Sequence, residues 1–177
     1  MPTVTLKGAP VRIAGELPVV GTQAPDFELV DDALRDRRLA DFAGRPKLIY
    51  IVPSVDTSVC AASTRRFNEL ATGRNAQVII VSADLPFAQK RFREVEELKN
   101  IVTLSIMRSR RFAEDYGVLI EDGPLAGITT RALVVLDADD RVLHTELVAE
   151  ISQQPDYEAA LAALDKASTD RSGTHWS

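Results

Sequence analysis

The sequence predicts one α/β domain, with a mixed central sheet and helices on both of its faces. Apolar runs rich in β-branched residues alternate with helix-like segments in the middle of the chain, at residues 47–52, 76–83 and 102–106. Such alternation is typical of parallel βαβ pairing. Nearer the C-terminus, the runs Arg131–Leu136 and Arg141–Val148 flank an Asp-rich turn and therefore predict an antiparallel hairpin. We expect the domain to span residues 1–167, followed by a flexible tail at 168–177.

The remaining strands are expected near the N-terminus, where short apolar segments are separated by Gly, Pro and Asp. They are a hairpin formed by Val4–Leu6 and Val11–Ile13, and two short strands at residues 27–30 and 34–39. A helical turn follows at residues 39–44. The predicted helices are 61–71, stopped by Gly73; 84–98, with Pro86 in its first turn; 109–116, stopped by Gly117; and 155–166.

Composition excludes several classes of function. The 177 residues carry a net charge of −5 with both signs interspersed, which argues against a binder of nucleic acid. The sequence has no apolar run of about 18 residues, so no membrane span is expected. The N-terminus lacks a basic region followed by an apolar stretch, so we expect no signal peptide. The single cysteine cannot form an internal disulfide, which fits a reducing compartment, most simply the cytoplasm.

That cysteine, Cys60, lies where a predicted strand gives way to a helix. The first N–H groups of a helix carry partial positive charge, so they stabilise a thiolate and are expected to lower the pKa of the thiol. Pro53 can shield the thiolate and removes a competing N–H donor. Thr57 lies three residues before the cysteine, so its hydroxyl can bond across the first turn and hold a substrate oxygen.

Cys60 also admits other interpretations. A lone cysteine is often a small apolar core residue, and position alone leaves that alternative open. A dithiol oxidoreductase is excluded because the sequence has no Cys-x-x-Cys motif. The two histidines, His144 and His175, are far apart, so no zinc site is expected. A Cys–His hydrolase would need His144 beside Cys60, but His144 lies within a predicted strand and is interpreted as an ordinary strand residue. No Gly-x-Gly-x-x-Gly motif or P-loop indicates a nucleotide.

The pattern Pro53-x-x-x-Thr57-x-x-Cys60 resembles the peroxidatic motif of the peroxiredoxins. The similarity is greatest to one subfamily, the bacterial thiol peroxidases, and runs from about Val4 to Lys166. Four separate segments carry it in the same order: 53–63, 82–89, 122–125 and 155–161.

The resemblance implies a thioredoxin-like fold with an N-terminal hairpin. It implies reduction of hydrogen peroxide and organic hydroperoxides without metal, haem or flavin, by a protein that is usually a homodimer. Cys60 matches the peroxidatic cysteine, Thr57 the hydroxyl that contacts the peroxide, and Pro53 the shielding proline. Arg131 matches the active-site arginine, which would stabilise the thiolate and the charge that develops on the peroxide.

The chain departs from this subfamily at Arg93, the position expected for a second, resolving cysteine. It is therefore either a natural one-cysteine protein or one in which the resolving cysteine has been replaced. An intramolecular disulfide cannot form, so oxidised Cys60 needs an external reductant such as thioredoxin or a low-molecular-weight thiol. A redox sensor that passes oxidation to a partner through a mixed disulfide is the alternative. A retired scaffold is disfavoured, because the four matched residues are all retained.

Overall fold

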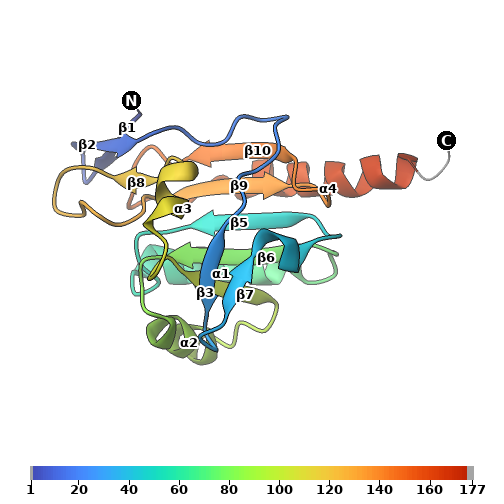
Figure 1. Cartoon of the computed structure of the whole chain (residues 1–177), viewed down its shortest axis with the longest axis horizontal. Coiled ribbons are helices and arrows are strands. Elements are labelled where there is room, and N and C mark those ends of the chain that lie inside the picture. The colour runs from blue at the N-terminus through green and yellow to red at the C-terminus, as the bar shows by residue number, and fades with distance from the viewer. Residues whose placement is uncertain (1, 175–177) are drawn as a thin grey trace.

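The computed structural model describes residues 2–174 of the chain, and the side chains of residues 2–167. Its main feature is a seven-stranded mixed sheet with the strand order β10-β9-β5-β6-β7-β3-β4 (Figure 1). The strands of this sheet are β3 (Glu28–Asp31), β4 (Asp36–Arg38), β5 (Lys47–Ile51), β6 (Gln77–Ser82), β7 (Ile101–Ser105), β9 (Ala132–Leu136) and β10 (Val142–Leu147).

The centre of the sheet follows the predicted pairing. β5, β6 and β7 are parallel, and β9 and β10 continue the sheet as an antiparallel hairpin. All residues of β5, β6 and β9 are buried, which explains their nearly continuous apolar sequence. The mixed sheet predicted from the sequence is therefore confirmed.

A second, three-stranded sheet has the order β1-β2-β8. β1 (Thr3–Leu6) and β2 (Ala9–Ala14) form the expected N-terminal hairpin, in which Val4 pairs with Val11. The third strand, β8 (Leu119–Ile120), was not predicted because two residues are too few to give a periodic pattern.

Helices cover both faces of the main sheet. They are the 3₁₀ turn η1 (Leu39–Phe42), α1 (Ser58–Ala71), α2 (Pro86–Val95), α3 (Arg110–Asp115) and α4 (Tyr157–Thr174). α1 and α4 share a buried cluster with Leu48 and Tyr50 of β5. η1 and α3 pack with Ile49 and Ile51, which point to the opposite face because side chains alternate along a strand.

Several helix ends differ from those expected. α1 begins at Ser58 rather than Ala61, so Cys60 lies inside the helix. α2 ends at Val95, earlier than the expected Leu98. α4 continues past Lys166 to Thr174, through part of the segment expected to be a tail, and residues 175–177 lie outside the described residues. None of the helices within residues 2–174 is long and apolar enough to cross a membrane.

Candidate active site

The predicted site residues meet at the edge of the main sheet where β5 ends. Ile51 pairs with Val81 of parallel β6 and with Ala132 of antiparallel β9. The loop 52–57 that follows β5 therefore begins beside Arg131, which immediately precedes Ala132. Strand register thus brings together two segments about 70 residues apart in the sequence.

The loop after β5 ends in a well-formed helix cap. Thr57 has extended backbone angles (φ −110°, ψ 149°), and its Oγ1 accepts a hydrogen bond from the N–H of Cys60 at 3.2 Å. The same hydroxyl donates to the carbonyl of Ser54 at 3.3 Å. Thr57 is exposed, whereas Pro53 is buried in the bend that leaves β5. The predicted bond across the first turn is therefore present.

Cys60 itself is buried, with an exposed fraction of 0%, and it is a free thiol. Its Sγ lies 3.6 Å from Oγ1 of Thr64, one turn further along α1. Burial raises the pKa of Cys60 to about 11, against the opposing effects of the Thr64 hydroxyl and the positive charge of Arg131. The negative charge of Asp84 acts in the same direction as burial. The expected lowering of the pKa is therefore wrong for this closed site, because desolvation outweighs the groups that favour a thiolate.

Arg131 is the largest fully buried side chain near the cysteine, with an exposed fraction of 2%. Its Nε donates to the carbonyl of Ile151 at 2.8 Å, and its Nη1 donates to the hydroxyl of Tyr50 at 2.8 Å. Both acceptors are neutral, and no carboxylate among the described side chains forms a salt bridge with it. A buried charge without a counter-ion is costly, so these surroundings favour an anion beside the guanidinium.

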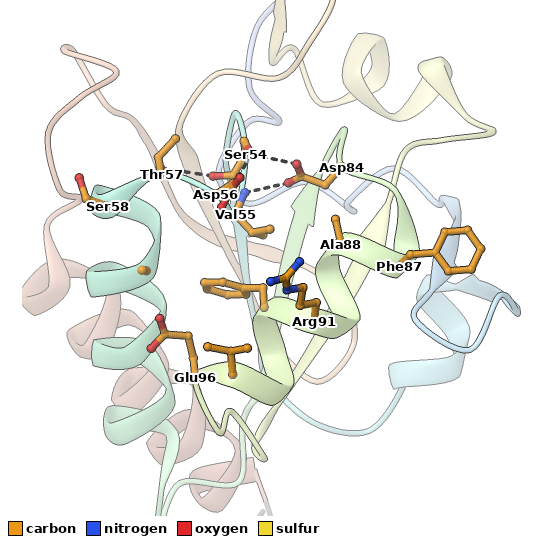
Figure 2. Close-up of a pocket in the computed structure, with 13 residues that line it drawn as sticks. Ser54, Val55, Asp56, Thr57, Ser58, Asp84, Phe87, Ala88, Arg91 and Glu96 are labelled. Carbon is orange, nitrogen blue, oxygen red and sulfur yellow. Dashed lines mark hydrogen bonds between the residues drawn. The ribbon is translucent and has the colours of Figure 1, made fainter.

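Asp84, which follows β6, forms hydrogen bonds to the loop 52–57, called here the cysteine loop (Figure 2). Its carboxylate accepts hydrogen bonds from the Ser54 hydroxyl at 2.8 Å and the Val55 N–H at 2.7 Å. It also accepts one from the Ser82 hydroxyl at 2.7 Å. The Ser82 hydroxyl in turn accepts from Nε2 of buried Gln89 on α2, at 2.9 Å. The loop therefore belongs to a hydrogen-bond network that extends into α2.

A pocket of about 870 Å³ lies between this loop, the start of α1 and one side of α2 (Figure 2). Its lining residues from the loop and α1 include Thr57 and Ser58, and those from α2 include Arg91 and Val95. Cys60 and Arg131 do not line it, so the sulfur lies behind the pocket wall. Two apolar residues of this wall, Phe87 and Val95, are 67% and 70% exposed.

Arg93, the position expected for a resolving cysteine, does not line this pocket. Its guanidinium forms a salt bridge with Asp32, with an Nη2–Oδ2 distance of 2.6 Å, on the side of β3 and β4. A side chain at position 93 is therefore directed away from Cys60 in this structure.

His144 lies in β10, as predicted. It pairs with Val135, which itself pairs with Leu48, toward the end of β5 remote from the cysteine loop. The register therefore does not support a Cys–His hydrolase. His175 lies outside the described residues.

Sequence reasoning gave no role to two residues that contact the predicted site. Asp84 belongs to a segment that carried the resemblance, but nothing local indicated that it bonds the loop. Tyr50 was interpreted only as part of an apolar strand. Its alternation with Ile49 and Ile51 could have placed it on the face of α1, but not against Arg131.

Comparisons with known proteins agree with these features. Residues 19–161 match the family model described as Redoxin. The thiol peroxidase of Mycobacterium tuberculosis is 51% identical over 164 residues, covering 93% of this chain and 99% of that protein. Among solved structures, a peroxiredoxin-like protein from Aquifex aeolicus has a TM-score of 0.88 and 38% identity, covering 94% of this chain and 98% of that one. A thiol peroxidase from Chromobacterium violaceum has a TM-score of 0.88 and 30% identity, covering 95% and 98% respectively.

Proposed function

The chain belongs to the Redoxin family, and from this premise we propose that it reduces hydroperoxides by a thiol-dependent reaction centred on Cys60. Its fold is the thioredoxin-like fold of its peroxiredoxin neighbours. The observation that carries the proposal is a buried thiol in the first turn of α1 close to a buried arginine that has no carboxylate partner among the described side chains. Once formed, a thiolate at Cys60 supplies the negative charge that this arginine otherwise lacks.

In the oxidation step, the thiolate of Cys60 attacks one oxygen of the peroxide. A sulfur–oxygen bond forms, the oxygen–oxygen bond breaks, and the second oxygen takes up the proton that the thiol released and leaves as water or alcohol. Sulfur is oxidised by two electrons to a sulfenic acid. Arg131 stabilises the charge on both oxygens, and the Thr57 hydroxyl holds the peroxide.

The thiolate forms when the cysteine loop opens toward the pocket. Burial is the largest cause of the raised pKa of Cys60, so entry of water or peroxide removes that cause and leaves the lowering effects of Thr64 and Arg131 against the smaller raising effect of Asp84. Thr57 and Ser58 line the pocket and precede Cys60 in the same helical turn, so water or peroxide enters past these two residues. Pro53, buried in the bend before the loop, limits solvent access and offers no N–H to the site.

The reduction step needs a thiol from outside the chain, because Cys60 is its only cysteine. Two external thiols supply two electrons, return the sulfenic acid to the thiol, and leave as a disulfide with release of water. We propose thioredoxin or a low-molecular-weight thiol as the reductant, in the cytoplasm. Similarity to thiol peroxidases favours such an enzyme over a sensor that does not turn over.

We also propose that the protein works as a homodimer. Two large apolar residues that line the pocket support this, because Phe87 and Val95 are 67% and 70% exposed. Sedimentation of the protein and of Phe87→Glu tests the assembly. A dimer that this substitution dissociates is the expected result, and a monomeric unmodified protein would contradict it.

One experiment tests the activity. The reduced protein receives one equivalent of hydroperoxide, and its intact mass is recorded within seconds. We expect a single-oxygen adduct that is absent from Cys60→Ser. Thioredoxin or a small thiol is then added, and peroxide consumption is followed over many turnovers. No adduct within minutes would reject the peroxidatic role of Cys60, and an adduct without turnover would favour the sensor.

A further inference from the structure

Tyr50 is the one tyrosine among the described residues that contacts the arginine of the site. It lies in β5, is fully buried, and its side chain faces α1 rather than the opposite layer. Its ring packs edge-on against Phe67 of α1, with ring centroids 5.1 Å apart. The Tyr50 side chain is therefore fixed by a strand behind it and a helix in front of it.

The hydroxyl of Tyr50 meets the guanidinium of Arg131 in a defined geometry. Arg131 Nη1 donates to this hydroxyl at 2.8 Å, and its Cζ lies 5.9 Å from the centre of the Tyr50 ring. The Ile151 carbonyl accepts from Nε at 2.8 Å. Two bonds from two different nitrogens fix the plane of a rigid, forked group.

Neither of these acceptors neutralises the arginine. A carbonyl carries no charge, and burial raises the pKa of Tyr50 to about 12, so its phenol stays protonated at neutral pH. A carboxylate at the same place would hold Arg131 equally well but would cancel its charge. Tyr50 therefore holds the guanidinium and leaves its charge available for an anion at Cys60.

We propose that Tyr50 is a positioning residue for the reaction, which holds the guanidinium of Arg131 toward Cys60 without acting as its counter-ion. This inference rests on the proposed function of the site. Tyr50 contacts neither the peroxide nor the sulfur in the mechanism, and it acts only through the arginine. Without the hydroxyl, buried Nη1 lacks an acceptor and the side chain turns to find one.

The test compares Tyr50→Phe with Tyr116→Phe. Tyr116 is equally buried, and its hydroxyl donates to the Pro25 carbonyl at 2.7 Å within the other core cluster. Both variants lose one buried hydroxyl bond and are expected to show similar falls in the denaturation midpoint. Only Tyr50→Phe is expected to slow sulfenic acid formation, by about tenfold or more, because a small displacement of the Arg131 guanidinium lowers the rate of the step that it stabilises.

A second measurement does not depend on peroxide. The rate at which iodoacetamide alkylates Cys60 is recorded against pH, and the pH of half-maximal rate is compared among the variants. We expect this pH to rise in Tyr50→Phe and to stay unchanged in Tyr116→Phe. An unchanged or lower value in Tyr50→Phe would overturn the proposal, and a lower value would mean that the phenol competes with the thiolate for Arg131.

A double-mutant cycle checks that Tyr50 acts through Arg131. In an Arg131→Lys background, Tyr50→Phe is expected to have less than a twofold further effect on either rate, because a lysine cannot make the same forked contact. A tenfold effect that persists there would reject the positioning role. Failure of the unmodified protein to form a sulfenic acid would reject the proposed function instead, while the alkylation profiles would still test the contact.

Discussion

Replacing Cys60 with serine should change how protein stability depends on pH, because the two environments considered for the thiol predict opposite signs. Burial raises the pKa of Cys60 from its ordinary value of 9.0 to about 11. A group whose pKa is higher in the folded state stabilises the fold below the unfolded value and loses that contribution as pH rises through the folded value. Each tenfold step in an ionisation constant is about 1.4 kcal/mol, so the loss amounts to about 3 kcal/mol.

The assay is urea unfolding of the unmodified protein and Cys60→Ser at intervals between pH 7 and 11. Serine does not ionise in this range, and every other titrating group, including Tyr50, is present in both proteins. We expect the difference in unfolding free energy to stay constant up to about pH 8 and then to shift by about 2 kcal/mol against the unmodified protein by pH 11, because the full loss of about 3 kcal/mol is reached only above the folded pKa. The opposite shift, a relative gain in stability as pH rises toward 9, would show that the folded site favours the thiolate and would refute the argument from burial.

Three further substitutions test the surroundings of the cysteine. Thr57→Val removes the cap of α1 and should lower stability by about 1 kcal/mol in urea unfolding and slow sulfenic acid formation, whereas Thr57→Ser should preserve both. Asp84→Asn keeps the shape of the loop contact but removes a negative charge that raises the pKa of Cys60. The pH at which iodoacetamide alkylates Cys60 at half its maximal rate should therefore fall, and an unchanged or higher value would contradict this. Arg93→Cys loses the salt bridge to Asp32, and the side chain at this position faces away from the pocket. Mass spectrometry after peroxide addition should therefore show a sulfenic acid first and a disulfide with Cys60 only later. A disulfide without that intermediate would be evidence against this geometry.

The central sheet could be predicted because its signals are local. The apolar runs of β5 and β6 reflect burial on both faces, and the Asp-rich turn before β10 marks a hairpin. The end of α2 could not be predicted, because Glu97 adopts a left-handed backbone conformation (φ 54°) that its residue type does not indicate. The extension of α4 to Thr174 could not be predicted either, because residues 168–174 are polar and carry no apolar periodicity. β8 depends on pairing with β2 and with a loop, which no run of two residues can reveal.

Within the candidate site too, local contacts could be predicted from the sequence and contacts that depend on strand register could not. Thr57 and Cys60 lie within one helical turn, so their contact follows from spacing alone. Arg131 was found only through the resemblance to a known motif, since its place depends on the register between β5 and β9. The contacts of Tyr50 and Asp84 depend on register too, and neither carried a motif that named its role. The predicted lowering of the Cys60 pKa was wrong because the burial that raises it depends on the whole fold.

Burial of Cys60 affects both the oxidation step and the reduction step of the proposed cycle. The same lack of exposure that keeps the thiol protonated also separates a sulfenic acid from any reductant larger than a peroxide. The network of Asp84 holds the loop closed, and it joins the loop to α2 through Ser82 and Gln89. A chain with a resolving cysteine can bring its own thiol to the sulfur, but this chain must admit one from outside. We therefore expect opening of the loop to govern both thiolate formation and reduction, and its free energy to set how long the oxidised cysteine persists.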